Sequence, residues 1–125
     1  MNHKIAIIED DTAISQMYRF KFEAEGHTVE TAENGKLGLE LIEKMRPDII
    51  LLDLMMPEMT GDKMLEELRK KPWGSDVNVI ILTNMGETEV PKKVYDLGVK
   101  IVILKADMTP RQVSEVVIKQ LSDKK

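Results

Sequence analysis

The chain has 125 residues, of which 42% are apolar and 32% are charged, and its formal net charge is -4 at pH 7. This length and composition predict one soluble globular domain over residues 1–125 and argue against disorder. The lack of cysteine excludes a disulfide framework and a thiolate metal site. The negative charge disfavours direct nucleic-acid binding. No signal-peptide pattern or apolar run of membrane-spanning length is present, so we expect no membrane contact and a cytoplasmic location.

The first half of the chain predicts two strands and two helices. An apolar run at 5–8 is followed by a helical pattern at 12–25, which ends at Gly26, a residue suited to a left-handed cap. The pattern places four side chains on one apolar stripe, namely Ile14, Met17, Tyr18 and Phe22. A weaker apolar run at 27–31 and a second helical pattern at 36–45 follow.

The second half continues the alternation of strands and helices. In chain order it predicts a strand at 49–52, a helix at 62–70, a strand at 77–82, a helix at 87–97, a strand at 101–104 and a helix at 110–121. Pro91 is expected near the start of its helix and Gly98 at the end of it, while Pro110 occupies a first-turn position.

The predicted strands are continuously apolar, which indicates burial on both faces, as in a parallel sheet covered by helices. Five strand-helix units with short, right-handed crossovers give an α/β fold with a doubly wound, five-stranded parallel sheet. We infer the strand order 2-1-3-4-5. In such sheets ligands bind beyond the carboxyl ends of the strands, where the strand order reverses.

Acidic residues gather at this expected site. Glu9, Asp10 and Asp11 follow the first strand and Asp53 follows the third, so the fold brings these carboxylates together. Two carboxylates about 4 Å apart repel by roughly 4 kcal/mol at an effective dielectric constant near 20, so the cluster needs a cation or a proton. Mg²⁺ prefers oxygen ligands, and Asp10 and Asp53 fit that role.

Three side chains suit phosphoryl chemistry at the same edge. A carboxylate attacks phosphorus to form an aspartyl phosphate, and Asp53 is the candidate nucleophile. Thr83 follows the fourth strand and offers a hydroxyl group, while Lys105 follows the fifth strand and offers a positive charge. Each residue taken alone has a structural explanation, as a helix cap, a strand end or a solvated lysine. Their shared position at the ends of different strands favours a functional site.

Four segments make the chain similar to the receiver domain of two-component response regulators, across essentially its whole length. They are Ile-Glu-Asp-Asp at 8–11, Leu-Leu-Asp-Leu-Met-Met-Pro-Glu-Met-Thr-Gly at 51–61, Ile-Leu-Thr-Asn at 81–84 and Leu-Lys at 104–105. The resemblance implies a flavodoxin-like fold and a switch activated by phosphorylation, with no catalysis beyond its own phosphorylation and dephosphorylation.

The resemblance also implies a role for each site residue. Asp53 accepts the phosphoryl group, and Mg²⁺ is held by Asp10, Asp53 and the backbone carbonyl of Met55, with Glu9 acting through water. Thr83 contacts a phosphoryl oxygen and Lys105 pairs with it, while Pro57 and Gly61 shape the loop after the acceptor. The implied partners are a sensor histidine kinase or phosphotransfer protein, a downstream protein on the face formed by the fourth helix, fifth strand and fifth helix, and a phosphorylation-dependent second copy.

The sequence departs from the family pattern near the switch. Ala106 stands where relatives usually have a cis proline after the lysine, and Val102 stands where many have an aromatic residue. These departures leave open how Lys105 is placed and how the switch is relayed. Asn84, Met55 and Met85 are expected to flank the pocket and to influence access of the phosphoryl donor or loss of the phosphoryl group.

Three other functions are considered as alternatives. A pseudo-receiver would act as an interaction module without being phosphorylated, and Val102 and Ala106 keep this alternative open. A phosphohydrolase with an aspartyl-phosphate intermediate is less favoured, because such enzymes commonly have an acidic residue where Met55 stands. A nucleotide-binding role is weaker still, because no glycine-rich phosphate motif follows the first strand.

His3 and His27 lie before strands, at the opposite edge from the acidic cluster, and are expected to be surface residues.

Overall fold

The structure is a computed structural model, and it describes residues 2–84 and 89–123. The strands are β1 (Lys4–Ile8), β2 (Thr28–Ala32), β3 (Ile49–Leu52), β4 (Asn78–Thr83) and β5 (Ile101–Leu104). The helices are α1 (Thr12–Ala24), α2 (Gly35–Met45), α3 (Gly61–Arg69), α4 (Lys92–Asp96), the 3-10 helix η2 (Lys105–Asp107) and α5 (Pro110–Asp123). All strand pairs are parallel and the order is β2-β1-β3-β4-β5, which confirms the predicted sheet.

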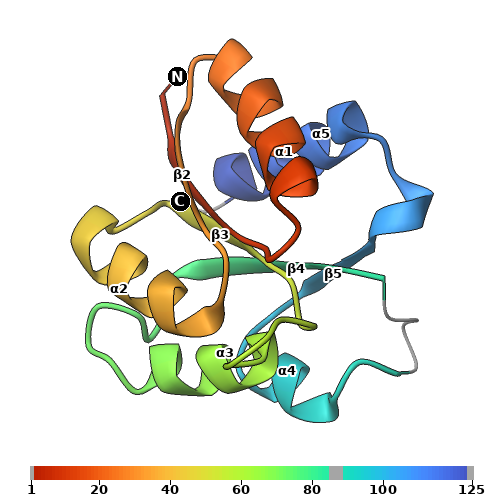
Figure 1. Ribbon diagram of the computed structural model, residues 1–125. Coiled ribbons are helices and arrows are strands. Elements are labelled where there is room, and N and C mark those ends of the chain that lie inside the picture. The colour runs from red at the N-terminus through yellow and green to blue at the C-terminus, as the bar shows by residue number, and fades with distance from the viewer. Residues whose placement is uncertain (1, 85–88, 124–125) are drawn as a thin grey trace.

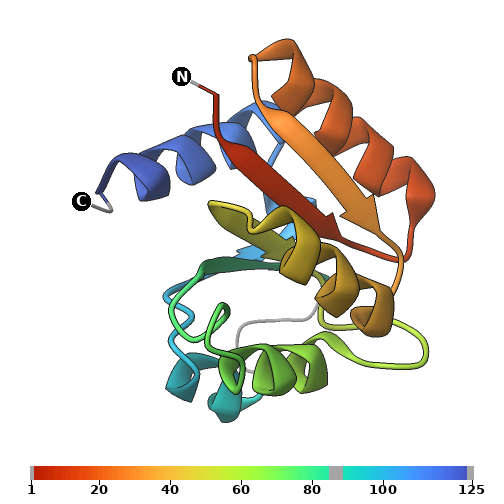
Figure 2. The same ribbon diagram turned by 90° about the vertical axis from the view of Figure 1, so that its left-hand side faces the viewer.

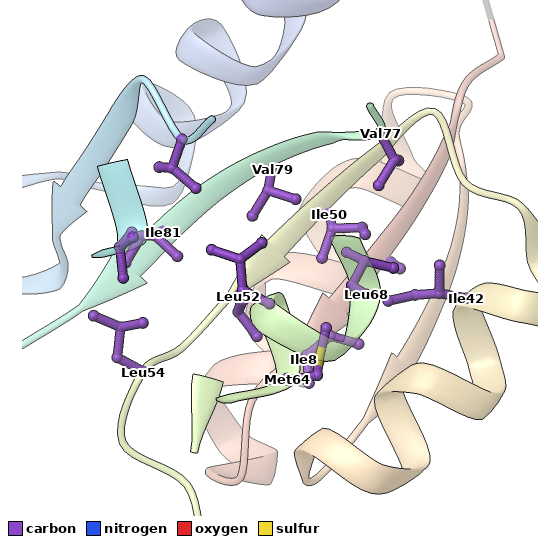
Figure 3. Packing of buried hydrophobic residues seen from close by; sticks show 14 of the residues in the cluster. Ile8, Ile42, Ile50, Leu52, Leu54, Met64, Leu68, Val77, Val79 and Ile81 are labelled. Atoms are coloured by element: carbon purple, nitrogen blue, oxygen red, sulfur yellow. The ribbon is translucent and has the colours of Figure 1, made fainter. Parts of the chain in front are cut away.

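The helices cover both faces of the sheet. Helices α1 and α5 lie on one face and α2, α3 and α4 lie on the other (Figures 1 and 2). The core is accordingly divided into two apolar clusters, one on each side of the sheet. Figure 3 shows one of them, in which Leu52 and Ile81 of the sheet face the same layer as Met64 and Leu68 of α3. The strands β1, β3 and β4 are therefore buried on both faces, as their sequence predicted, whereas the edge strands β2 and β5 are only partly buried.

Local side-chain caps fix where the first two helices begin. The Asp11 carboxylate accepts hydrogen bonds from the Ala13 and Ile14 N–H groups at the start of α1. The Asn34 side chain accepts one from the Leu37 N–H group at the start of α2. Both interactions satisfy backbone donors that have no partner within the helix. Helix α2 ends at Arg46, whose φ of 51° lies in the left-handed region.

The start of the fourth helix was predicted too early. Helix α4 begins at Lys92, whereas the sequence pattern placed its start at residue 87, and residues 87 and 88 lie outside the described part of the chain. Pro91 precedes the helix with φ -58° and ψ 138°. Proline lacks an N–H donor and disfavours helical geometry in the residue before it, so the helix forms only after Pro91.

Two predictions of burial were wrong. Met17 was predicted on the buried stripe of α1 but is 44% exposed, and Ser15 is buried in that layer instead. The helix turns by about 100° per residue, so Met17 points away from Tyr18, which meets the sheet. His27 was expected at the surface but is buried, and its Nδ1 atom accepts a hydrogen bond from the His3 N–H group at 3.2 Å.

No helix in the described part of the chain is both long and apolar enough to cross a membrane.

Candidate functional site

The strand register places two of the predicted acidic residues side by side. Ile8 of β1 pairs with Leu52 of β3, so Glu9 and Asp53 leave the sheet at neighbouring positions. The Asp53 N–H group donates to the Ile8 carbonyl at 3.0 Å and extends this pairing by one residue. The two carboxylates are therefore held by the edge of the sheet itself, which is a rigid support for a binding site.

Glu9, Asp10 and Asp53 form the predicted acidic cluster. Each offers a carboxylate oxygen, and these three oxygens lie within 4.8 Å of one another. Glu9 and Asp53 are buried, at 3% and 5% exposure, while Asp10 is exposed. Burial raises the pKa of Glu9 to about 7, despite an opposing hydrogen bond from Lys105, and the nearby Asp53 charge adds to the rise. The repulsion between these neighbouring carboxylates is unfavourable, and a bound cation would reduce it.

Asp11 was expected to converge with this cluster but has a different task. Its carboxylate caps α1, and its N–H group donates to Oε2 of Glu9 at 3.2 Å. Asp11 therefore contributes a backbone donor that orients Glu9, while its carboxylate is engaged at the helix start.

Lys105 reaches the acidic cluster from the end of β5. Its ammonium group contacts Oε1 of Glu9 and lies 3.4 Å from Oδ2 of Asp53, and the side chain is only 11% exposed. Burial alone would lower the pKa of Lys105, but the hydrogen bond to Glu9 and the negative charge of Asp53 outweigh it and hold the pKa above its usual value. The described backbone contains no cis peptide bond, and the chain turns after β5 through η2. The lysine thus reaches the cluster with Ala106 in place of proline.

Thr83 and Asn84 lie at the end of β4. Thr83 is the last residue of this strand and is fully buried, whereas the sequence placed it just after the strand. Asn84 is exposed and lines the cleft above the acidic cluster. Met85, which was also expected to flank the pocket, lies outside the described residues.

The loop after Asp53 is tightly packed against the start of α3. The Met55 N–H group donates to Oδ1 of Asp53 at 3.2 Å, and the Met55 side chain is 60% exposed at the cleft. The Gly61 N–H group donates to the Leu54 carbonyl at 3.0 Å. A Cβ atom at Gly61 would lie 2.1 Å from the Asp53 carbonyl oxygen, so only glycine fits there. Pro57 is exposed in this loop.

These residues line a small cleft of about 210 Å³ at the carboxyl edge of the sheet. Its walls are Glu9, Asp10, Asp11, Ile14, Asp53, Met55, Asn84 and Lys105. Ile14 was predicted only as a core residue of α1, and no motif in the sequence marked it as part of the cleft. The donor set consists of three carboxylates, which are the hard oxygen ligands that Mg²⁺ prefers. A buried carboxylate beside a cation site and an ammonium group is suited to accept a phosphoryl group.

Comparison with known proteins identifies the family. The chain matches the family model of the response regulator receiver domain over residues 5–117, and it belongs to this family. Such domains are switches of two-component signal transduction rather than enzymes in the usual sense.

Related proteins are consistent with this identification. Sporulation initiation phosphotransferase F of Bacillus subtilis is 36% identical over 78% of this chain and 77% of its own length. The phosphate regulon transcriptional regulatory protein PhoB of Rhizobium meliloti is 31% identical over 90% of this chain but only 50% of its own length. The DNA-binding regulator RpaA of Synechocystis is 35% identical over 76% of this chain and 39% of its own length. The chain thus spans half or less of these two transcriptional regulators.

Solved structures give the same fold. The receiver domain of the Francisella response regulator 1452 has a TM-score of 0.87 and 30% identity, and the match covers 99% of this chain and 100% of that one. A CheY-like receiver from Methanospirillum hungatei has a TM-score of 0.88 and 28% identity, over 98% and 96% of the two chains. The chemotaxis protein CheY4 of Vibrio cholerae shares the fold, with a TM-score of 0.87 at 24% identity, over 95% and 98% of the two chains.

Proposed function

We propose that the chain is a phosphorylation switch that accepts a phosphoryl group on Asp53 with the help of Mg²⁺. The observation that carries this proposal is the convergence of two further carboxylates, Glu9 and Asp10, and the ammonium group of Lys105 around Asp53, at the carboxyl edge of the sheet. Membership of the receiver-domain family supports the same function. We also propose that it acts in the cytoplasm, as one receiver domain over residues 1–125.

In this proposal each side chain has a defined role in phosphoryl transfer. A carboxylate oxygen of Asp53 attacks phosphorus, and the bond to the donor's leaving atom breaks with its electron pair, so one phosphoryl group moves without oxidation or reduction. Asp10, Asp53 and the Met55 carbonyl would hold Mg²⁺, with Glu9 acting through water. The bound ion supplies charge neutralisation at the phosphoryl oxygens. Lys105 stabilises the same developing charge, and the Thr83 hydroxyl contacts a phosphoryl oxygen.

The phosphoryl donor is proposed to be a histidine kinase or phosphotransfer protein that docks along α1. This helix exposes a second apolar stripe opposite its buried face, formed by Ala13, Met17, Phe20 and Ala24. The spacing of four, three and four residues places these side chains on one side of the helix, as at a helix-helix interface. Phe20 is 79% exposed. The stripe begins beside Ile14 and Asp11, which line the cleft, so a helix docked there would lie next to Asp53.

We propose that a downstream partner recognises the phosphorylated state at the face formed by α4, β5 and α5. Phosphorylation replaces the single negative charge of the Asp53 carboxylate by a phosphoryl group with a charge of about -1.5 to -2, which draws Lys105 and Thr83 toward it from the ends of β5 and β4. These strands lead into η2 and toward α4, so the shift changes the surface that a partner contacts. A downstream protein or a second copy of the chain is the proposed partner. No direct nucleic-acid contact is proposed for these residues, because the chain carries a net negative charge.

Intact-mass spectrometry tests the phosphorylation itself. The wild-type chain is incubated with Mg²⁺ and acetyl phosphate, beside an Asp53→Asn variant and a sample containing EDTA. We expect one phosphoryl group that is acid-stable and base-labile, absent from the variant and from the EDTA sample. A folded wild-type chain that binds Mg²⁺ but gains no phosphoryl group, from acetyl phosphate or from a panel of histidine kinases, would favour the pseudo-receiver instead.

A further inference from the structure

Helix α4 is attached to α3 at both of its ends. Near the start of α4, the Lys93 ammonium nitrogen lies 3.3 Å from Oδ2 of Asp62 and 3.3 Å from Oε2 of Glu66. These two carboxylates are one turn apart on the same side of α3. At the end of α4, the Arg69 side chain donates to the Leu97 carbonyl at 2.8 Å. Figure 1 shows the two helices side by side on the lower face of the sheet.

The two attachments differ in strength. Arg69 also donates to the carbonyls of Gly74 and Val77 at 3.0 and 2.8 Å, so it joins the end of α4 to the segment that leads into β4. Three charge-assisted hydrogen bonds from one half-buried side chain form a stable anchor. The Lys93 side chain is 43% exposed, and exposed ion pairs contribute little and are screened by salt. The Lys93 attachment is therefore the one that releases more easily.

The attachment of Lys93 to α3 is connected to Asp53 through Gly61. Asp62 follows Gly61, whose N–H group donates to the carbonyl of Leu54, the residue after Asp53. The space between Gly61 and the Asp53 backbone is too small for a single Cβ atom. Close packing of this kind transmits displacements, because no void absorbs them. A change in the position of the Asp53 backbone therefore moves the first turn of α3, which carries Asp62.

We propose that Asp62, Glu66 and Lys93 form an electrostatic clasp that holds α4 against α3 in the unphosphorylated chain and opposes phosphorylation of Asp53. Arg69 is the fixed end about which α4 turns when the clasp opens. This inference rests on the proposed function. The coupling is reciprocal, so a clasp that phosphorylation weakens must itself disfavour phosphorylation by the same factor.

The test compares two lysine variants with the same change of charge. Lys93→Gln removes the clasp, while Lys70→Gln removes an exposed lysine that pairs with Glu67, 3.2 Å away and three residues earlier in the chain, without reaching α4. With Mg²⁺ and limiting acetyl phosphate, we expect Lys93→Gln to be phosphorylated roughly two- to fivefold faster than wild type, the range that exposed ion pairs allow. Lys70→Gln should match wild type. The affinity for beryllofluoride, a phosphoryl mimic, should also rise in Lys93→Gln, because the coupling acts on the binding equilibrium.

Two further measurements make the test specific to the clasp. Amide hydrogen exchange should be faster at Val94 in Lys93→Gln than in Lys70→Gln, because the Val94 N–H group donates to the Pro91 carbonyl at the start of α4, which is the end that the clasp holds. Adding Asp62→Asn to Lys93→Gln should change the phosphorylation rate little further, because the two residues take part in the same interaction.

The possible results separate the clasp from the proposed function. Equal rates and affinities in the two lysine variants overturn the clasp, as does slower phosphorylation of Lys93→Gln. A wild-type chain that accepts no phosphoryl group and binds no beryllofluoride overturns the proposed function, and the claim that the clasp opposes phosphorylation fails with it.

Discussion

The ammonium nitrogen of Lys105 lies 3.4 Å from Oδ2 of Asp53, although the two residues are 52 positions apart in the chain. The same ammonium group contacts Glu9. One buried positive charge is thus shared between two buried carboxylates in the unphosphorylated chain. A phosphoryl group on Asp53 would compete with Glu9 for Lys105, so this contact links the chemistry at Asp53 to the end of β5.

Replacing Lys105 by methionine should weaken both the fold and phosphoryl transfer. Glu9 and Asp53 would remain buried without their charged donor, and we expect the free energy of unfolding to fall by about 1–3 kcal/mol at pH 8. Urea denaturation measures this loss, and Mg²⁺ should stabilise the variant more than wild type because it replaces the missing charge. Lys100→Met, at an exposed lysine, is the control and should be nearly neutral. Unchanged stability of Lys105→Met would contradict a charge-balancing role.

Gly61→Ala should be damaging because the added methyl group meets the backbone of Asp53 and Leu54, which cannot rotate away. Overpacking of this kind costs about 1–3 kcal/mol or more, and displacement of Asp53 should also slow phosphorylation. Gly26→Ala is the matched control. Gly26 has a φ of 92° and open space around it, so alanine there should cost about 1–2 kcal/mol of stability through backbone strain without changing the phosphorylation rate. Equal rates in both variants would argue against a role for Gly61 in placing Asp53.

His27 should contribute stability that increases with pH, whereas Glu9, whose pKa burial raises from 4.5 to about 7, contributes stability that decreases with pH between these values. Burial lowers the pKa of His27 below its usual 6.5, and the neighbouring His3 adds to this effect. The unfolded chain therefore binds more protons between the two pKa values, so the stabilisation is complete above pH 6.5 and is lost as the pH falls below it. Protonation of Nδ1 would also remove the acceptor of the His3 N–H group.

Urea denaturation between pH 5 and 8 isolates the His27 contribution as the difference in stability between wild type and His27→Asn, which one proton limits to a change of about 1.4 kcal/mol per pH unit. In His27→Asn the amide oxygen replaces Nδ1 as acceptor and does not titrate, so the stability of wild type relative to this variant should increase as the pH rises toward 6.5. His3→Asn keeps His27 buried and should keep most of the slope. Identical slopes in wild type and His27→Asn would assign the pH dependence to other groups.

Phe20→Gln should separate docking of the donor from the chemistry at Asp53. The side chain is 79% exposed on α1 and contributes little to the core, so the stability and the rate with acetyl phosphate should stay unchanged. Transfer from a phosphorylated kinase or phosphotransfer domain should slow by about fivefold or more, because exposed aromatic residues commonly dominate such interfaces. Tyr95→Gln on α4, also an exposed aromatic residue, is the control and should leave the transfer rate unchanged. Equal effects of the two substitutions would place the docking surface elsewhere.

The sequence by itself determined the order of elements, the parallel sheet and the edge at which the acidic residues meet. Apolar periodicity and the rules of strand connection depend on short segments, so they can be recognised in one amino-acid sequence. Strands β3 and β5 were predicted with the bounds that the structure has, because each is a run of four consecutive aliphatic residues. Once β1 and β3 are neighbours, the approach of Glu9 to Asp53 follows from their positions after the strands.

Only the tertiary structure decided which side chains touch across the fold. The contact between Lys105 and Glu9 joins residues 96 positions apart, and it depends on how the chain turns after β5. The burial of His27, the exposure of Met17 and the contact of Lys93 with α3 were likewise absent from the local pattern. Periodicity assigns a residue to a face of its own helix or strand, but the neighbours that cover this face come from distant segments whose placement depends on packing of the whole core.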